Sequence, residues 1–126
     1  MINAIGSFRR IGSPPGARPV LADTGWRPTR VPKSQGMTPR SRDYYRDQSG
    51  KVRSGVWACN AGTIEIQDNP AEEVCFVVSG TVRVTDCTGR SETFGTGECL
   101  ALPRGFSGLW AQSDDFAIVY VAVEGA

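Results

Sequence analysis

From Tyr44 onward the sequence consists of short runs of β-branched, aromatic and aliphatic residues, and this pattern constrains the fold more than any other feature. Glycine-containing turns separate the runs at roughly the 8–12-residue spacing typical of sandwiches and barrels. No stretch has a helical period, so we expect an antiparallel all-β domain of the jelly-roll kind. The predicted strands are 52–59, 63–67, 74–78, 81–85, 91–94, 99–102, 108–111 and 116–123.

Residues 1–42 have a different composition, rich in Pro, Gly, Ser and Arg, with neither a strand nor a helical period. A chain of 126 residues is the size of one domain, and a content of 40% hydrophobic and 21% charged residues favours globular folding. We therefore expect an irregular N-terminal arm (residues 1–42) followed by one β-barrel domain (residues 43–126).

The formal net charge of +1 conceals an asymmetry along the chain. Residues 1–53 carry 11 of the 14 basic and 3 of the 13 acidic side chains, a net +8, and the rest of the chain carries a net −7. A basic front and an acidic back attract each other, within one chain or between two copies. The alternative is that the basic segment is a solvated tail.

The cysteines indicate a reducing compartment. Cys59, Cys75, Cys87 and Cys99 form no CxxC pair, and three of them lie in apolar runs, where free cysteine packs as a small hydrophobe. The first ten residues lack the apolar core of a signal peptide, and no apolar run is long enough to span a bilayer. We expect a cytoplasmic protein with reduced thiols and no membrane association.

Two glycine-bounded motifs occur in the second half of the chain. Glu73 precedes Gly80 with six residues between them, and the run 97–108 begins and ends with glycine and contains Pro103 and Gly105. These motifs resemble those of the cupin superfamily, G-x5-H-x-H-x3,4-E-x6-G and G-x5-P-x-G-x2-H-x3-N. The resemblance covers roughly residues 43–123 and implies a cupin double-stranded β-helix, or jelly-roll barrel. The runs 54–57, 73–82 and 94–98 are similar to small single-domain cupins of the ureidoglycine aminohydrolase type.

The chain contains no histidine, whereas the resemblance implies a Mn, Fe, Ni or Zn site built from three imidazoles and one carboxylate. Glu73 stands at the carboxylate position and Gly108 at the last histidine position. Carboxylate and amide oxygens suit Ca or Mg, but such sites gather six or more oxygens. We therefore expect no metal and no other cofactor. Depending on the motif spacing, the first two histidine positions hold Gln67 and Asn69, or Ile66 and Asp68.

Glu73 is the main candidate for the site. In the strand it shares one face with Cys75, so a lone carboxylate in an apolar barrel is predicted, able to bind a ligand or to act as a general acid or base. The alternative is a strand-end Glu bonded to a loop or an arginine. Cys75 and Cys99 have no imidazole base to activate them, so core packing is favoured over a nucleophilic role. The predicted ligand-binding residues are Gln67, Asn69, Glu73, Cys75, Arg104 at the barrel rim and Trp110 in the wall.

Three functions compete on these observations. The leading one is a cupin that binds a small polar organic metabolite in the barrel without a histidine-bound metal. The second is an enzyme, a metal-independent isomerase or lyase or a ureidoglycine-aminohydrolase-like protein, with Glu73 as the catalytic acid or base. The third is binding of nucleic acid or an acidic protein by the arginines of the arm, which the acidic barrel disfavours. The resemblance also implies a homodimer in which the arm packs on the neighbouring barrel.

Overall fold

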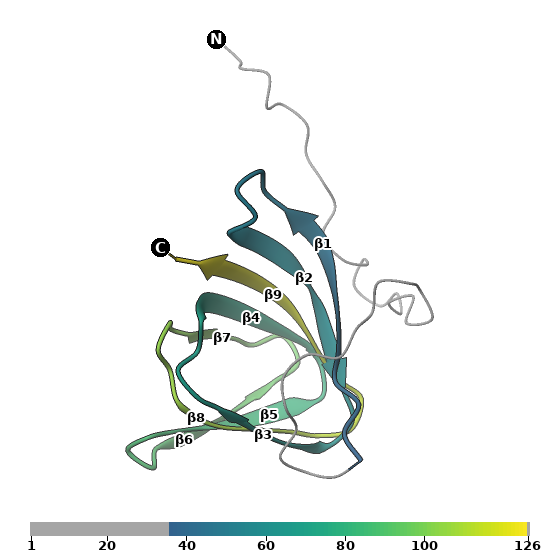
Figure 1. The fold of residues 1–126 in the computed structure, drawn as a ribbon. Helices are drawn as coiled ribbons and strands as arrows, with labels where there is room; N and C mark the ends of the chain where they lie inside the picture. The colour runs from purple at the N-terminus through teal and green to yellow at the C-terminus, as the bar shows by residue number, and fades with distance from the viewer. Residues whose placement is uncertain (1–35, 126) are drawn as a thin grey trace.

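The computed structural model describes residues 36–125, which form two antiparallel β-sheets that face each other around an interior (Figure 1). One sheet has five strands in the order β1-β2-β9-β4-β7, and the other has four in the order β3-β8-β5-β6. The described residues contain no helix that could cross a membrane. The strands are β1 (Arg40–Arg46), β2 (Val52–Cys59), β3 (Gly62–Ile66), β4 (Ala71–Ser79), β5 (Thr81–Asp86), β6 (Ser91–Gly95), β7 (Cys99–Leu102), β8 (Gly108–Gln112) and β9 (Phe116–Glu124).

The all-β jelly-roll prediction is confirmed, and each of the eight predicted strands has a counterpart. The predictions for β2 and β7 match at both ends, whereas β4 begins earlier than predicted, at Ala71. The sequence missed β1, which begins at Arg40 inside the segment predicted to be irregular and pairs with β2. The rest of the predicted arm, residues 1–35, lies outside the described residues, as does any packing of that segment on a neighbouring barrel.

Alternation along β4 separates the interior from the outer surface. Ala71, Glu73, Cys75 and Val77 are buried, whereas the side chains between them face outward. The outward row of β4 is nevertheless apolar in sequence. The outward-facing Val74, Phe76 and Val78 are 42%, 44% and 45% exposed.

Three aromatic rings from both sheets form the centre of the core. Trp57 of β2, Trp110 of β8 and Phe116 of β9 lie in mutual edge-to-face contact, with ring centroids 5.8–6.1 Å apart. Such pairs add about 0.5–1.5 kcal/mol to the stabilisation from apolar burial alone. The cluster joins the sheets because Trp110 belongs to one of them and its two partners to the other.

The turn between β4 and β5 requires glycine at the last position of the first motif. Gly80 has a φ of +77°, and a Cβ there would lie 2.8 Å from Ser113 Oγ and 3.1 Å from Phe116 Cα. Only glycine adopts this conformation without steric cost. The motif residue that follows Glu73 by seven positions therefore sets the tight turn by which the chain passes from β4 in one sheet to β5 in the other.

Candidate functional site

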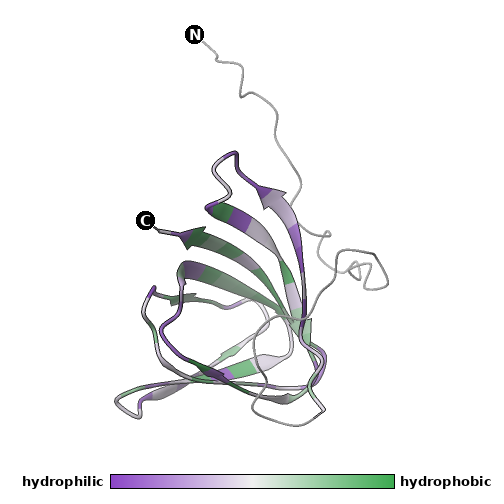
Figure 2. Cartoon of the chain, viewed as in Figure 1, coloured by the Kyte–Doolittle hydropathy of each residue, from purple (hydrophilic) through white to green (hydrophobic). Residues whose placement is uncertain are grey.

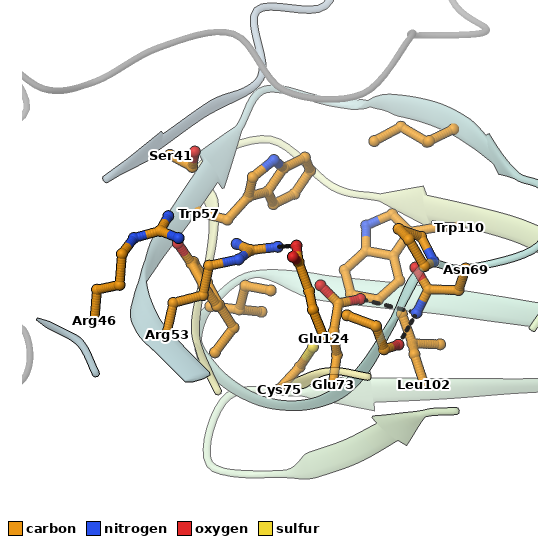
Figure 3. Close-up of a pocket in the computed structure, with 15 residues that line it drawn as sticks. Ser41, Arg46, Arg53, Trp57, Asn69, Glu73, Cys75, Leu102, Trp110 and Glu124 are labelled. Carbon is orange, nitrogen blue, oxygen red and sulfur yellow. Dashed lines mark hydrogen bonds and ion pairs between the residues drawn. The ribbon is translucent and has the colours of Figure 1, made fainter. Parts of the chain in front are cut away.

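A cavity of about 350 Å³ lies between the two sheets (Figure 3). Figure 3 places Glu73, Asn69 and Trp110 toward one end of it and Arg46 and Arg53 toward the other. Its volume is at the lower end of the range typical of small-ligand pockets. The cavity is lined by Ser41, Arg46, Arg53, Trp57, Ile64, Asn69, Pro70, Ala71, Glu73, Cys75, Leu102, Trp110, Ile118, Tyr120 and Glu124.

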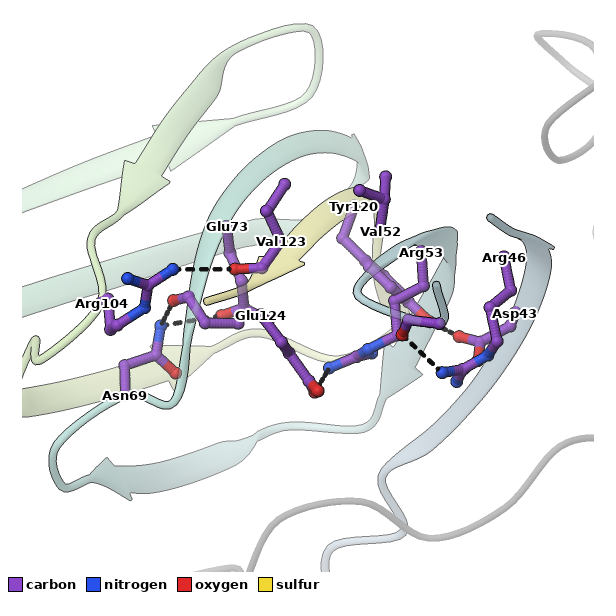
Figure 4. Close-up of polar contacts among 12 residues, drawn as sticks. Asp43, Arg46, Val52, Arg53, Asn69, Glu73, Arg104, Tyr120, Val123 and Glu124 are labelled. Carbon is purple, nitrogen blue, oxygen red and sulfur yellow. Dashed lines mark hydrogen bonds and ion pairs between the residues drawn. The ribbon is translucent and has the colours of Figure 1, made fainter. Parts of the chain in front are cut away.

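Glu73 and Asn69 form a buried polar pair in this cavity. Asn69 is 1% exposed and Glu73 is 8% exposed. The Asn69 amide Nδ2 donates to Glu73 Oε2 over 3.1 Å and to the carbonyl oxygen of Ala71 over 2.9 Å (Figures 3 and 4). The backbone of Asn69 is held by Phe106 and Gly105, since its N–H donates to Phe106 O and its carbonyl accepts from Gly105 N–H. The β7–β8 turn of the second motif thus positions the amide that orients the carboxylate of the first.

Trp110 lines the cavity and carries an unpaired donor. The residue is 4% exposed, and its indole Nε1 is buried without a hydrogen-bond partner in the described structure. An unsatisfied buried donor costs about 1–3 kcal/mol, so most such groups in folded proteins find a partner.

Charged side chains surround the other end of the cavity (Figure 4). Arg53 lies 3.4 Å from Glu124 and stacks over the Tyr120 ring at 5.8 Å. Asp43 accepts hydrogen bonds from the Tyr120 hydroxyl and, over 2.8 Å, from Arg46 Nη2. Positive and negative groups alternate across this rim, which suits a ligand of low net charge.

The contact between Asp43 and Tyr120 moves the pKa values of the two groups in opposite directions. Burial raises the pKa of Asp43, but the hydrogen bonds from Tyr120 and Arg46 and the charge of Arg53 outweigh it, so the pKa is lowered overall. Burial and the Asp43 carboxylate raise the pKa of Tyr120 well above its usual value. Both groups therefore keep their ordinary charge states, an ionised Asp43 and a neutral Tyr120, near neutral pH.

Replacing Asp43 with Asn is expected to lower the free energy of unfolding near neutral pH. The difference from wild type should become smaller at acid pH. Because the folded-state pKa of Asp43 is depressed, its contribution is present above the unfolded pKa near 4 and is lost as the pH falls through the folded value. Urea midpoints of wild type and D43N, measured from pH 7 to pH 3, should therefore converge at the acid end. The control is E92Q, at an exposed ion pair that contributes little. A constant offset between wild type and D43N would contradict this assignment.

The structure brings together four of the six predicted ligand-binding residues: Asn69, Glu73, Cys75 and Trp110 all line the cavity. Gln67 is exposed in the β3–β4 connection. Arg104 lies in the β7–β8 turn, where its backbone N–H donates to Glu72 Oε1. Its guanidinium Nη2 lies 3.5 Å from the carbonyl oxygen of Val123 (Figure 4). Cys99 is exposed on the outer surface, away from Cys75.

Sequence reasoning did not single out Arg46, Arg53, Tyr120 or Glu124 as site residues, although all four line the cavity. Arg53 and Glu124 are 71 positions apart in the sequence, and Tyr120 and Asp43 are 77 apart. No local motif connects such residues. The charged residues within otherwise apolar strands could have indicated these positions. A charge on the inward face of a strand requires a partner, so such residues are expected at a polar site.

The donor set does not fit the metal that the cupin motifs imply. Among residues 36–125, no three Cys, Asp or Glu side chains gather as a metal site requires, and the chain has no histidine. Glu73 has the Asn69 amide, the Cys75 thiol and the Trp110 indole as cavity neighbours, and the second carboxylate of the lining, that of Glu124, is paired with Arg53. Two carboxylates are fewer than the oxygen ligands that a hard cation requires.

Two facing antiparallel sheets, a turn glycine after the buried Glu73 and a cavity between the sheets are the features of a cupin. The model of the EutQ-like cupin domain matches residues 46–120, so the chain belongs to this family of the cupin superfamily. No curated protein matches the chain in sequence.

Solved structures share the fold at low sequence identity. The EutQ protein of Clostridium difficile superposes with a TM-score of 0.61 at 18% identity, over 71% of this chain and 70% of that one. A DUF861-family protein of unknown function from Pseudomonas syringae gives a TM-score of 0.69 at 19% identity, over 78% of this chain but only 44% of that one. Ectoine synthase from P. lautus gives 0.60 at 18% identity, over 69% and 64% of the two chains. At these identities the likeness shows the fold alone.

Proposed function

We propose that this protein binds a small polar organic molecule inside the barrel, without a histidine-bound metal. The observation that carries the proposal is the buried Glu73–Asn69 pair in a cavity that Trp110, with its unpaired indole N–H, also lines. Concave pockets that are mostly apolar and have a few converging polar groups are the usual sites for such ligands. The aromatic and aliphatic remainder of the wall supplies apolar contact for the body of the molecule.

The polar groups favour a particular ligand class. Glu73 accepts hydrogen bonds, whereas the indole of Trp110 only donates. A complementary ligand carries an N–H donor close to a carbonyl acceptor, as amides, lactams and cyclic ureas do. The mixed charges at the rim favour a neutral or zwitterionic molecule over a strongly charged one.

Replacing Glu73 with Gln is expected to weaken binding of such molecules by about tenfold or more, because a hydrogen bond to a charged group contributes about 1.5–3 kcal/mol. Ligand-observed NMR with 2-pyrrolidinone, 2-imidazolidinone and hydantoin measures this, with the N-methylated compounds as ligand controls. The matched control variant is E72Q, since Glu72 is the neighbouring carboxylate on the outward face. Equal binding by wild type and E73Q, or none by wild type to any probe, would contradict the proposal.

An enzyme that uses Glu73 as its acid or base is the second candidate, favoured by the burial of this carboxylate in a cavity. Native mass spectrometry of protein purified without chelator identifies a retained small molecule, which then serves as the substrate for a turnover assay. Abolished turnover by E73Q with retained binding would favour the enzyme. Lost binding without any turnover in wild type would favour the binding protein.

Three further expectations, on the activity, the compartment and macromolecular partners, are proposals as well. A ureidoglycine-aminohydrolase-like activity has the polar, nitrogen-containing ligand class in its favour, but its metal has no fitting donor set among the described residues. We propose the cytoplasm as the compartment, supported by four free cysteines. Binding of nucleic acid or an acidic protein depends on arginines that lie mostly before residue 36, outside the described residues.

A further inference from the structure

Two arginines stand side by side on the inner surface of the five-stranded sheet. Arg46 of β1 pairs with Arg53 of β2 across the strands, and both line one end of the cavity. Figure 2 shows hydrophilic colour along β1 and near the start of β2, whereas β9 is hydrophobic along most of its length. Like charges directly opposite each other destabilise a sheet, so each arginine needs an anion nearby.

The two arginines differ in how firmly an anion holds them. Arg46 Nη2 lies 2.8 Å from Asp43 Oδ2, and Arg46 Nη1 donates to the carbonyl oxygen of Gly50 over 3.0 Å. Arg53 Nη2 lies 3.4 Å from Glu124 Oε1, which is longer than a well-formed charged hydrogen bond of about 2.7–2.9 Å (Figures 3 and 4). The Glu124 side chain is 48% exposed, and exposed ion pairs contribute little to stability. Arg53 can therefore exchange this partner for another carboxylate at small cost.

The strand register places Arg53 and Glu73 on either side of Ala122. Arg53 of β2 and Glu73 of β4 both pair with Ala122 of β9, the strand between them. Directly paired residues point to the same face of a sheet, and both charged side chains line the cavity. Their backbones are two strand spacings apart, about 9.5 Å, and the residue between them has only a methyl group. A cation and an acceptor thus stand within reach of one small molecule.

We propose that the ligand in the cavity carries a carboxylate, which binds Arg53 in place of Glu124 while an N–H of the ligand binds Glu73. The assignment rests on the proposed function, because it concerns the other end of the same ligand. The Tyr120 ring, 5.8 Å from the guanidinium carbon of Arg53, supports the cation in this position. Glu124 moves out into water when it is displaced, so one carboxylate replaces another and the charge balance around Arg53 is kept. The ligand class is therefore a small cyclic amide with one carboxylate.

The first test compares an acid with its neutral counterpart. Ligand-observed NMR titrations give the dissociation constants of 5-oxoproline, its carboxamide and 2-pyrrolidinone. Wild type should bind 5-oxoproline at least tenfold more tightly than the carboxamide, because arginine and a carboxylate form charged hydrogen bonds. R53Q should lose this preference and bind the two compounds equally. The matched control is R90Q, at an exposed ion pair between β5 and β6, which should keep the preference.

The E124Q variant gives a test that misfolding cannot imitate, because the expected change is a gain of affinity. Removing the competing carboxylate should tighten the binding of 5-oxoproline several-fold and leave that of the carboxamide unchanged. E72Q removes an outward-facing carboxylate of β4 and should change neither.

The outcomes separate this proposal from the one on which it rests. If 2-pyrrolidinone binds wild type but 5-oxoproline binds no better than its carboxamide, the carboxylate site is overturned and the amide site stands. A preference for the acid that persists in R53Q, or an E124Q variant that gains no affinity for it, would likewise overturn the exchange at Arg53. If none of the three compounds binds wild type, both proposals are overturned.

Discussion

Replacing Phe116 with alanine is expected to lower the free energy of unfolding by about 4 kcal/mol. Phe116 is 1% exposed, and its ring contacts the edges or faces of both Trp57 and Trp110. The substitution removes this shared partner and leaves a cavity between the two sheets, so the loss combines lost apolar burial with lost ring contacts. For a domain whose total stability is about 5–15 kcal/mol, that is a large fraction.

Urea denaturation followed by tryptophan fluorescence measures this effect, since the rings of Trp57 and Trp110 adjoin the changed side chain. F116L keeps most of the volume and should cost less than about 1.5 kcal/mol. L109A serves as the surface control and should stay within about 0.5 kcal/mol of wild type. A loss of less than 1 kcal/mol for F116A would show that the three-ring cluster does not hold the sheets together.

The strands that sequence reasoning located are those with an apolar inward row. The missed strand, β1, has the sequence RSRDYYR, in which the inward positions Ser41, Asp43 and Arg46 are polar because they face the cavity rim. The alternation rule assumes an apolar interior, so a strand at a polar site escapes it. The outer row of β4 departs from the rule in the other direction, since its valine and phenylalanine side chains are apolar and yet exposed.

The candidate site was predictable in part from the first motif. One of its two possible spacings places Asn69 at a histidine position, and the structure puts the amide of Asn69, just before β4, in contact with Glu73. The rim was not predictable, because Arg53, Tyr120 and Glu124 meet only through the pairing of β2 with β9. The missing hydrogen bond of Trp110 is likewise a property of packing, since it depends on which acceptors lie around the indole.

Gly108 stands at the position where the second cupin motif has its histidine, and its replacement is expected to be among the most damaging in the chain. A Cβ at this position would lie 2.1 Å from the carbonyl oxygen of Thr85 and 2.8 Å from Phe106 Cζ. The phenylalanine ring can turn away, but the Thr85 carbonyl belongs to β5. Gly108 pairs with Ile66 of β3 on one side and with Asp86 of β5 on the other, so the backbone cannot shift without disturbing both ladders.

G108A should therefore cost about 3 kcal/mol or more, at or beyond the upper end of ordinary overpacking. G108H, which restores the residue of the motif, should cost more and bind no zinc, because the strand has no space for the side chain and the other imidazoles are absent. Urea denaturation and metal analysis of the purified variants measure both effects. The matched control is G95A, whose Cβ would make only ordinary contacts at 3.7 and 3.8 Å. A folded G108H with one equivalent of zinc would show that only the histidines, and not the space around them, separate this barrel from a metal-binding cupin.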